Sequence, residues 1–348
     1  KCTIQNIADH LGLSRNTVSK ALKNSSEVSE NTRNLVIKTA SKLGYKNATF
    51  ATPVIPASET GSNGTILFLT RTYASDSEFW TTVLRGIESI LSNANYHLAI
   101  SIMSDSDLKQ LNFPQTISDS SIKGIILVEI CDKVVCDALS QFNLPIVSVD
   151  MPNVPFEELN GIDVVTMESK KNLKKIINQL IEKGAESFGF VGDLYSPNVS
   201  RGFQERYNAL SECLAEHQLP LNQKNCLLHQ TPEDFRNFQT TVNNLQAMIS
   251  LPDVFICGND WTAIQLIYAL QFLGFQIPKD ICVVGFDNIP AASRISPSLT
   301  TISTPQKYLG IAAARQILER IQHPNCPHVF CQYETELIIR NSTNIISF

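Results

Sequence analysis

The stretch Ser14-Arg15-Asn16-Thr17 carries side chains that suit the edges of DNA bases. An arginine can donate two parallel hydrogen bonds to O6 and N7 of guanine, and an asparagine can pair with adenine in the same two-bonded way. The next polar side chains, Thr17, Ser19 and Lys20, suit phosphate or sugar contacts. The alternative is that all of them are solvated side chains of an ordinary three-helix bundle.

The pattern around this stretch predicts three short helices. The first has its apolar residues at i, i+3, i+4 and i+7 and ends at Gly12, after which Ser14 can cap a second. Ser29 can cap a third helix that ends at Gly44, where Ser29 and Thr32 would offer hydroxyl and backbone N–H groups to phosphate. A helix, a glycine turn and a helix are the outline of a helix-turn-helix, whose second helix enters the major groove. The apolar residues are Ile4, Ile7, Ala8 and Leu11, then Val18, Ala21 and Leu22, then Leu35, Val36, Ala40 and Leu43.

Polar side chains also follow several apolar runs farther along the chain. Carboxylates can accept two sugar hydroxyls, and an amide can both donate and accept. Phe79 and Trp80 could stack on a sugar face. The alternatives are helix N-caps for the polar residues and core packing for the aromatic ones, with one of the two aromatics expected in the core. The polar residues are Asp150, Asn259, Asp260 and Asp287.

From Thr65 onward, strand-like apolar runs alternate with helical patterns, which predicts an α/β body of parallel sheets covered on both faces. Its length predicts two lobes with a ligand cleft between them. We expect a helical head over residues 1–46, a linker over 47–64 and the body over 65–348. Within the body, the N-lobe is predicted at about 65–162 and 291–322, and the C-lobe at about 163–290 and 323–348.

Charge is distributed unevenly along the chain. The net charge is −5, yet residues 1–50 hold eight Lys/Arg against three Asp/Glu, so the head carries +5 and the remainder −10. A basic head suits nucleic acid. Nine cysteines without zinc-ligand spacing, and the absence of phosphate-loop or nucleophile-elbow motifs, argue against a metal, a cofactor and catalysis. No apolar stretch or leader suggests a membrane or export, so a cytoplasmic protein is expected.

The head resembles the DNA-binding head of the lactose-repressor/galactose-repressor family. The resemblance covers residues 3–22, reading TIQNIADHLGLSRNTVSKAL, then Val28-Ser29-Glu30-Asn31-Thr32-Arg33 and Leu43-Gly44-Tyr45. In the family, the pair at Arg15 and Asn16 reads bases. The resemblance implies a DNA-binding set of Thr3, Ser14, Arg15, Asn16, Thr17, Ser19, Lys20, Ser29, Thr32, Arg33 and Tyr45.

The body resembles the same family at several separate motifs. They are Phe79-Trp80 with Leu84-Arg85-Gly86-Ile87-Glu88, then residues 255–260, 283–290, 297–302 and 336–343. Arg206 occupies the family's effector-clamping position, although alone it would be taken for a solvated helix charge. Ser77 stands where the family often has Asn. The implied effector set is Ser77, Phe79, Trp80, Asp150, Arg206, Asn259, Asp260 and Asp287.

The resemblance implies a dimeric repressor of a carbohydrate-use operon, which binds a pseudo-palindromic operator and a sugar-like effector between its lobes. A body that responds to a protein or to a non-sugar effector is the alternative. Two departures stand out. Residues 47–56 lack the family's hinge Leu and Arg and contain Pro53 and Pro56, which leaves a hinge helix open, and Glu168-Ser169 replaces the usual Asp-Asn.

Overall fold

The computed structural model describes residues 3–22, 28–29, 32–33, 35–36, 39–40, 62–71, 77–194, 200–229 and 237–343. The chain divides into two units, residues 1–61 and 62–348. The first is the head and the second is the body. The predicted linker and hinge at 47–61 lie outside the described residues.

The head is built on two helices, α1 (Ile4–Leu11) and α2 (Arg15–Leu22). Thr3 caps α1 in a capping box with Asn6, and Gly12 ends it with φ 63°, a left-handed conformation that glycine adopts at little cost. Apolar side chains from both helices and from the described part of residues 28–40 form one small core. Its buried members are Ile7, Ala8, Val18, Ala21, Val28, Val36 and Ala40.

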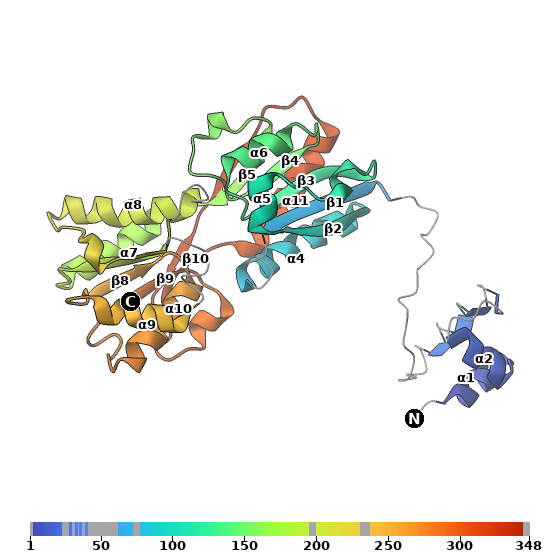
Figure 1. The fold of residues 1–348 in the computed structure, drawn as a ribbon, viewed down its shortest axis with the longest axis horizontal. Helices are drawn as coiled ribbons and strands as arrows, with labels where there is room; N and C mark the ends of the chain where they lie inside the picture. The colour runs from blue at the N-terminus through green and yellow to red at the C-terminus, as the bar shows by residue number, and fades with distance from the viewer. Residues whose placement is uncertain are drawn as a thin grey trace. The chain divides into compact units, whose positions relative to one another are not determined.

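The body contains two six-stranded sheets, one in each lobe (Figure 1). The N-lobe sheet has the order β11-β5-β4-β3-β1-β2 and the C-lobe sheet β12-β10-β9-β8-β6-β7. Neighbouring strands are parallel except β12, which runs antiparallel to β10. The strands of the N-lobe are β1 (Gly64–Arg71), β2 (Tyr96–Met103), β3 (Ile122–Val128), β4 (Ile146–Val149), β5 (Ile162–Met167) and β11 (Phe330–Tyr333). Those of the C-lobe are β6 (Phe188–Asp193), β7 (Leu227–His229), β8 (Val254–Cys257), β9 (Cys282–Asp287), β10 (Thr300–Ser303) and β12 (Glu336–Ile338).

Helices cover both faces of each sheet, which confirms the predicted α/β class. Along β1, Ile66 and Phe68 face one apolar cluster while Leu67 and Leu69 face another, as the two-residue repeat of a strand requires. The N-lobe helices are α4 (Glu78–Asn93), α5 (Asp105–Gln110), α6 (Lys133–Ser140) and α11 (Gln306–Gln322). The C-lobe has α7 (Lys171–Glu182) and α8 (Arg201–Glu216) on one face, and α9 (Phe238–Ala247) and α10 (Asp260–Phe272) on the other (Figure 1).

The two N-lobe helices α4 and α11 approach each other very closely. A Cβ atom on Gly86 would run into the carbonyl oxygen of Lys307, and one on Gly310 would run into the carbonyl oxygen of Val83. Glycine is therefore required at both positions for close backbone contact. The close contact between α4 and α11 explains the glycine in the motif Leu84-Arg85-Gly86-Ile87-Glu88.

The chain passes between the lobes at other points than the sequence predicted. β5 and β11 belong to the N-lobe sheet, and β10 belongs to the C-lobe sheet. The crossings therefore lie at 168–170, 304–305 and 334–335, rather than after 162, 290 and 322. The boundary predicted after 290 was wrong because β10, with the sequence Thr-Thr-Ile-Ser, lacks the apolar run that marks the other central strands. The boundaries after 162 and 322 were wrong because β5 and β11 pair with each other in the N-lobe sheet.

The first crossing explains one departure from the family pattern. Oε1 of Glu168 accepts hydrogen bonds from the backbone N–H groups of Lys170 at 2.6 Å and Lys171 at 2.8 Å. Glu168 thus satisfies N–H groups at the start of α7 and is not among the residues that line the pocket described below.

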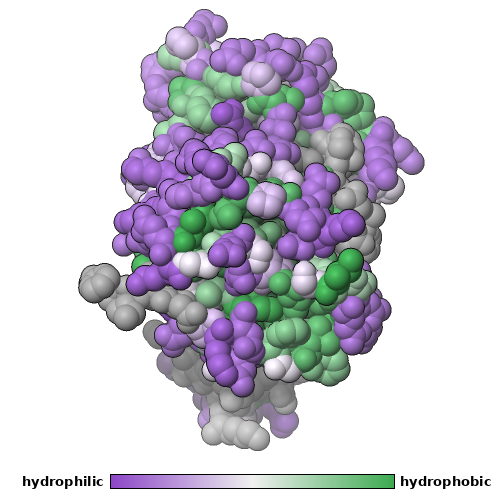
Figure 2. Space-filling model, turned by 90° about the vertical axis from the view of Figure 1, so that its left-hand side faces the viewer, coloured by the Kyte–Doolittle hydropathy of each residue, from purple (hydrophilic) through white to green (hydrophobic). Residues whose placement is uncertain are grey.

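The outward surface of the C-lobe is mostly hydrophilic (Figure 2). Figure 2 shows hydrophobic residues gathered mainly in the lower half of this face. Within the described part of the chain, no helix is long and apolar enough to cross a membrane.

Candidate functional site

The start of α2 presents its polar side chains to solvent. Ser14 caps the helix, because its Oγ accepts from the backbone N–H of Thr17 at 3.0 Å and lies 2.8 Å from the hydroxyl of Thr17. Arg15 and Asn16 are exposed, and Val18 is turned into the core. The geometry leaves the two predicted base-reading side chains available at the N-terminal end of a helix, as major-groove reading requires.

The other residues predicted to contact DNA differ in their hydrogen bonds and in their exposure to solvent. The Ser29 Oγ accepts from the backbone N–H of Thr32 at 3.3 Å and lies 2.8 Å from its hydroxyl, so Ser29 caps the next helical segment as expected. Arg33 donates to the carbonyl oxygen of Val28 at 3.1 Å, which ties one of its amino groups to the head itself. Thr3 and Ser29 are exposed, Ser19, Lys20 and Thr32 are partly exposed, and Tyr45 lies outside the described residues.

A pocket of about 630 Å³ lies between the two lobes of the body, in the size range of small-molecule sites. Both lobes contribute to its wall, and so do seven of the eight predicted effector residues. The seven are Ser77, Phe79, Trp80, Asp150, Arg206, Asn259 and Asp287. The wall also contains Arg71, Glu78, Glu129, Cys131, Met167, Asp193, Ser200, Phe203, Trp261, Ile264, Ile289 and Ala291.

Four carboxylates of the wall stand at the carboxyl ends of parallel strands. Glu129 and Asp150 come directly after β3 and β4 of the N-lobe, and Asp193 and Asp287 are the last residues of β6 and β9 of the C-lobe. The carboxyl ends of parallel strands are where open α/β sheets bind ligands. The two lobes thus bring their carboxylate-bearing sheet ends to one pocket.

Three of these carboxylates sit on strained backbone. Glu129, Asp150 and Asp287 have φ values of 58°, 73° and 117°, in a region that side chains other than glycine rarely adopt. The carbonyl oxygen of Asp287 accepts from the side-chain amide of Gln306 at 2.6 Å and from the hydroxyl of Thr304 at 3.2 Å. Such strain persists only where surrounding contacts hold it, and it concentrates at ligand sites.

Arg206 is the buried cation of the pocket, with only 3% of its surface exposed. Its guanidinium carbon lies 3.7 Å from the centre of the Phe286 ring, and Nη1 donates to the carbonyl oxygen of Gly258 at 2.7 Å. Its Nε has no hydrogen-bond partner among the described residues. Burial lowers the pKa of the guanidinium, and the nearby carboxylates Asp287 and Asp150 oppose that shift. An arginine fixed in this way offers a preformed donor to a ligand.

The pKa values of three carboxyl groups of the pocket wall, those of Glu129, Asp150 and Asp287, are raised, primarily because burial disfavours their charged form. The pKa of Asp287 lies well above its usual range despite the attraction of Arg206, and that of Asp150 is also raised by burial. Burial raises the pKa of Glu129 to about 7 against the attraction of Arg71, and neighbouring Asp193 and Asp150 also raise it. Perturbed carboxyl groups of this kind cluster at functional sites.

Asp260 is the one predicted effector residue outside the pocket wall. It is fully buried, and its carboxylate accepts from the Thr301 hydroxyl at 2.5 Å and from the backbone N–H of Ile289 at 2.9 Å. Burial raises its pKa to about 6. Asp260 thus connects β10 to the turn after β9, and through Ile289 it contacts a residue of the pocket wall without lining the pocket itself.

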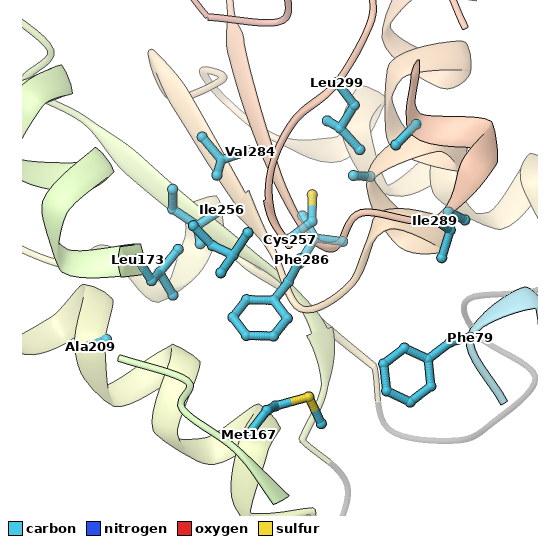
Figure 3. Close-up of a cluster of buried hydrophobic side chains, with 14 of the residues drawn as sticks. Phe79, Met167, Leu173, Ala209, Ile256, Cys257, Val284, Phe286, Ile289 and Leu299 are labelled. Carbon is cyan, nitrogen blue, oxygen red and sulfur yellow. The ribbon is translucent and has the colours of Figure 1, made fainter. Parts of the chain in front are cut away.

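The remaining predicted residues divide between wall and core. Asn259 caps α10 by accepting from the backbone N–H of Thr262 at 2.8 Å, while also lining the pocket. Phe79 packs into the core and meets Trp80 edge to face at 4.5 Å, whereas Trp80 is half-buried. In Figure 3 the ring of Phe79 lies below Ile289, and the side chains of Met167 and Phe286 lie to its left.

Sequence reasoning missed Glu129, Asp193 and Arg71. The rule that selected Asp150 and Asp287 would have found Glu129, which directly follows the apolar run Ile125–Val128. Asp193 stands two residues after another such run. Arg71 ends β1 and forms an ion pair with Asp105 at 2.7 Å. In the described part of the chain, no group of three His, Cys, Asp or Glu could hold a metal ion.

Comparison with known proteins matches both units. Residues 3–47 match the family of bacterial regulatory proteins described as the lacI family, and residues 177–343 match a periplasmic binding protein-like domain. The chain is 27% identical to the ribose operon repressor of Haemophilus influenzae and 26% identical to the HTH-type transcriptional repressor PurR of Photobacterium profundum, over 98% of each chain. It shares its fold with the lac repressor dimer bound to operator and the anti-inducer ONPF (TM-score 0.67, 20% identity, 98% of this chain and 99% of that chain).

The fold and the two sites define a DNA-binding regulator whose body is a two-lobed binding domain. The head matches the lacI family of bacterial regulatory proteins, and the relatives that match almost the whole chain are repressors.

Proposed function

We propose that this protein is a homodimeric repressor of a carbohydrate-use operon, controlled by a small polyhydroxylated effector bound between its lobes. The observation that carries the proposal is a pocket lined by strand-end carboxylates, a buried arginine and aromatic rings, on the same chain as a helix that begins with exposed Arg15 and Asn16. Carboxylates and arginine suit sugar hydroxyls, and the relatives include a ribose operon repressor. We expect it to work in the cytoplasm, where it can reach the chromosome.

Effector and operator are coupled because each changes the protein that the other binds. A ligand that contacts both lobes favours one arrangement of the lobes, and by linkage the operator must then alter ligand affinity by the same factor. Two heads related by two-fold symmetry match a pseudo-palindromic operator.

Arg15→Ala is expected to reduce the preference for operator over random DNA by about 10- to 100-fold, because one bidentate base contact is lost. Fluorescence anisotropy with both DNAs at one salt concentration measures this ratio. Lys20→Ala is the matched control, since losing a phosphate contact weakens both DNAs alike. Equal weakening of both DNAs by Arg15→Ala would show that Arg15 contacts phosphate.

A thermal-shift screen tests the sensing half of the proposal. Neutral sugars, amino sugars, sugar phosphates and nucleobases are each added to the full chain, and hits are then tested for their effect on operator affinity. A ligand at about 100 times its Kd stabilises the folded state by about 2.7 kcal/mol, which raises the melting temperature measurably. The proposal fails if no sugar shifts melting; a shift produced by nucleobases alone would point to a non-sugar effector.

A further inference from the structure

The two lobes are joined by a non-covalent contact besides the three crossings of the chain. The backbone N–H of Arg201, at the start of α8 in the C-lobe, donates to the carbonyl oxygen of Met151 at 2.9 Å. Met151 follows β4 in the N-lobe, and the neighbouring residues Pro152 and Ser200 form an isolated antiparallel β-bridge. We call these two segments, residues 150–152 and 200–201, the interlobe clasp.

The side chain of Arg201 also reaches the N-lobe. Its guanidinium carbon lies 5.2 Å from the centre of the Phe330 ring in β11, which is within the range of a cation–π contact. Nη1 lies 3.8 Å from the sulfur of Met151, and Nε donates to Glu205 on the next turn of α8 at 2.8 Å. The carboxylate of Glu205 therefore orients a C-lobe cation over an N-lobe ring, a contact that exists only while the lobes are close together.

The interlobe clasp lies directly beside the pocket. Asp150 and Ser200 line the pocket from opposite lobes, and they immediately precede Met151 and Arg201 in the sequence. The backbone N–H of Met151 donates to the Asp150 carboxylate at 2.8 Å, so the clasp also fixes a wall residue that sits on strained backbone. The two walls cannot separate here without breaking the clasp. Arg201 itself is not among the residues that line the pocket.

We infer that Arg201 is a positioning residue that holds the two lobes together beside the pocket and so determines how readily the cleft opens. Every contact of the clasp is between groups of the chain itself, so it requires no bound ligand. The inference goes beyond the proposed function, because it concerns the lobes whatever ligand binds between them. The apparent affinity of any such ligand scales with the populated fraction of the arrangement that binds it.

Acrylamide quenching of tryptophan fluorescence measures the opening of the cleft. The sequence contains two tryptophans, and both line the pocket, Trp80 from the N-lobe and Trp261 from the C-lobe. In a Trp261→Phe background of the full chain, all tryptophan emission comes from half-buried Trp80. Arg201→Gln in this background removes the cation–π contact, and we expect the ratio of closed to open cleft to fall about two- to fivefold. The quenching constant of Trp80 should rise accordingly.

A second variant and a matched control locate the effect. Phe330→Leu removes the other half of the same contact and should raise the quenching constant similarly, with little further rise in the double variant. Either single variant suffices if the other does not fold. Lys133→Gln is the control, because Lys133 is also the first residue of its helix and pairs with a carboxylate four residues later, Asp137, within the N-lobe. The control should keep the quenching constant of the Trp261→Phe protein.

Melting temperatures distinguish an opened cleft from a destabilised fold. The quenching constant should rise in Arg201→Gln without a lower melting temperature, because a partly exposed ion pair contributes little to folding. An unchanged quenching constant in both variants would overturn the inference, and so would a rise that appears only together with a lower melting temperature. The measurement uses no sugar, so a protein that binds none in the thermal-shift screen would overturn the proposed function and leave this inference standing.

Discussion

Asp287→Asn is expected to weaken effector binding by about 10- to 100-fold while leaving operator affinity unchanged. The substitution turns one acceptor oxygen into a donor and removes the charge, and a hydrogen bond to a charged group contributes about 1.5–3 kcal/mol. Titration of the effector against the purified protein measures the loss. The same protein bound to labelled operator should no longer respond to effector.

The melting temperature distinguishes this loss of binding from misfolding. Because burial raises the pKa of Asp287 above its unfolded value, its stabilising contribution is greatest at low pH and is lost as pH rises through the folded pKa. At neutral pH the burial of this carboxyl therefore opposes folding, so the melting temperature of the variant should not fall. Asp280→Asn, an exposed carboxylate of the same lobe, is the control that should retain the effector response. An unchanged response in Asp287→Asn would remove Asp287 from the site.

Arg320→Met is expected to lower the free energy of unfolding by about 3–5 kcal/mol, because it leaves a buried carboxylate without its cation. Asp163 is fully buried, and its two oxygens accept from Nε and Nη2 of Arg320 at 3.0 and 2.8 Å. The backbone N–H of Val329 donates to the same carboxylate at 2.7 Å, so the pair also fixes the start of β11. Urea unfolding measures the change, and Arg315→Met on the exposed face of α11 is the matched control.

The pH dependence of this effect follows from the Asp163 carboxyl. Burial opposes its ionisation, yet hydrogen bonds from Arg320 and Val329 hold its pKa below the ordinary value. The stability that the pair contributes is therefore present above the unfolded pKa and is lost as pH falls through the folded pKa. The difference between wild type and Arg320→Met should shrink in acid. A difference that is small at neutral pH would mean that other donors satisfy Asp163.

Much of the fold follows from local sequence pattern. The continuous apolar runs at 66–69, 98–102, 125–128, 146–149, 188–191, 254–257 and 281–286 located the strands β1 to β4, β6, β8 and β9. All of these strands except β2, which lies at a sheet edge, are largely buried. β10 was missed because its buried threonines satisfy their hydroxyls through other polar groups. Thr300 pairs with Thr343 at 2.9 Å, and Thr301 donates to Asp260. Such pairing depends on residues distant in sequence.

The residues of the candidate site were likewise predicted where local sequence pattern is enough and missed where their role depends on residues distant in sequence. A polar residue after an apolar run marks the carboxyl end of a strand, which correctly predicted that Asp150 and Asp287 would lie together. The rule could not tell that Asp260 turns inward beneath Gly285. Arg206 looked like a solvated charge, although it shares the helical stripe of buried Gly202, Ala209, Leu210 and Cys213. Its position on that stripe could have predicted from the sequence that Arg206 is buried.

The three crossings between the lobes have a consequence for how this body can change over evolution. Each lobe is assembled from separate stretches of the chain, and the final crossing at 334–335 supplies an edge strand to each sheet. No single recombination breakpoint within the body therefore exchanges one lobe and leaves the other intact. New ligand preferences must arise by substitution at the strand ends or by exchange of the whole body, while the head can be exchanged as one contiguous segment.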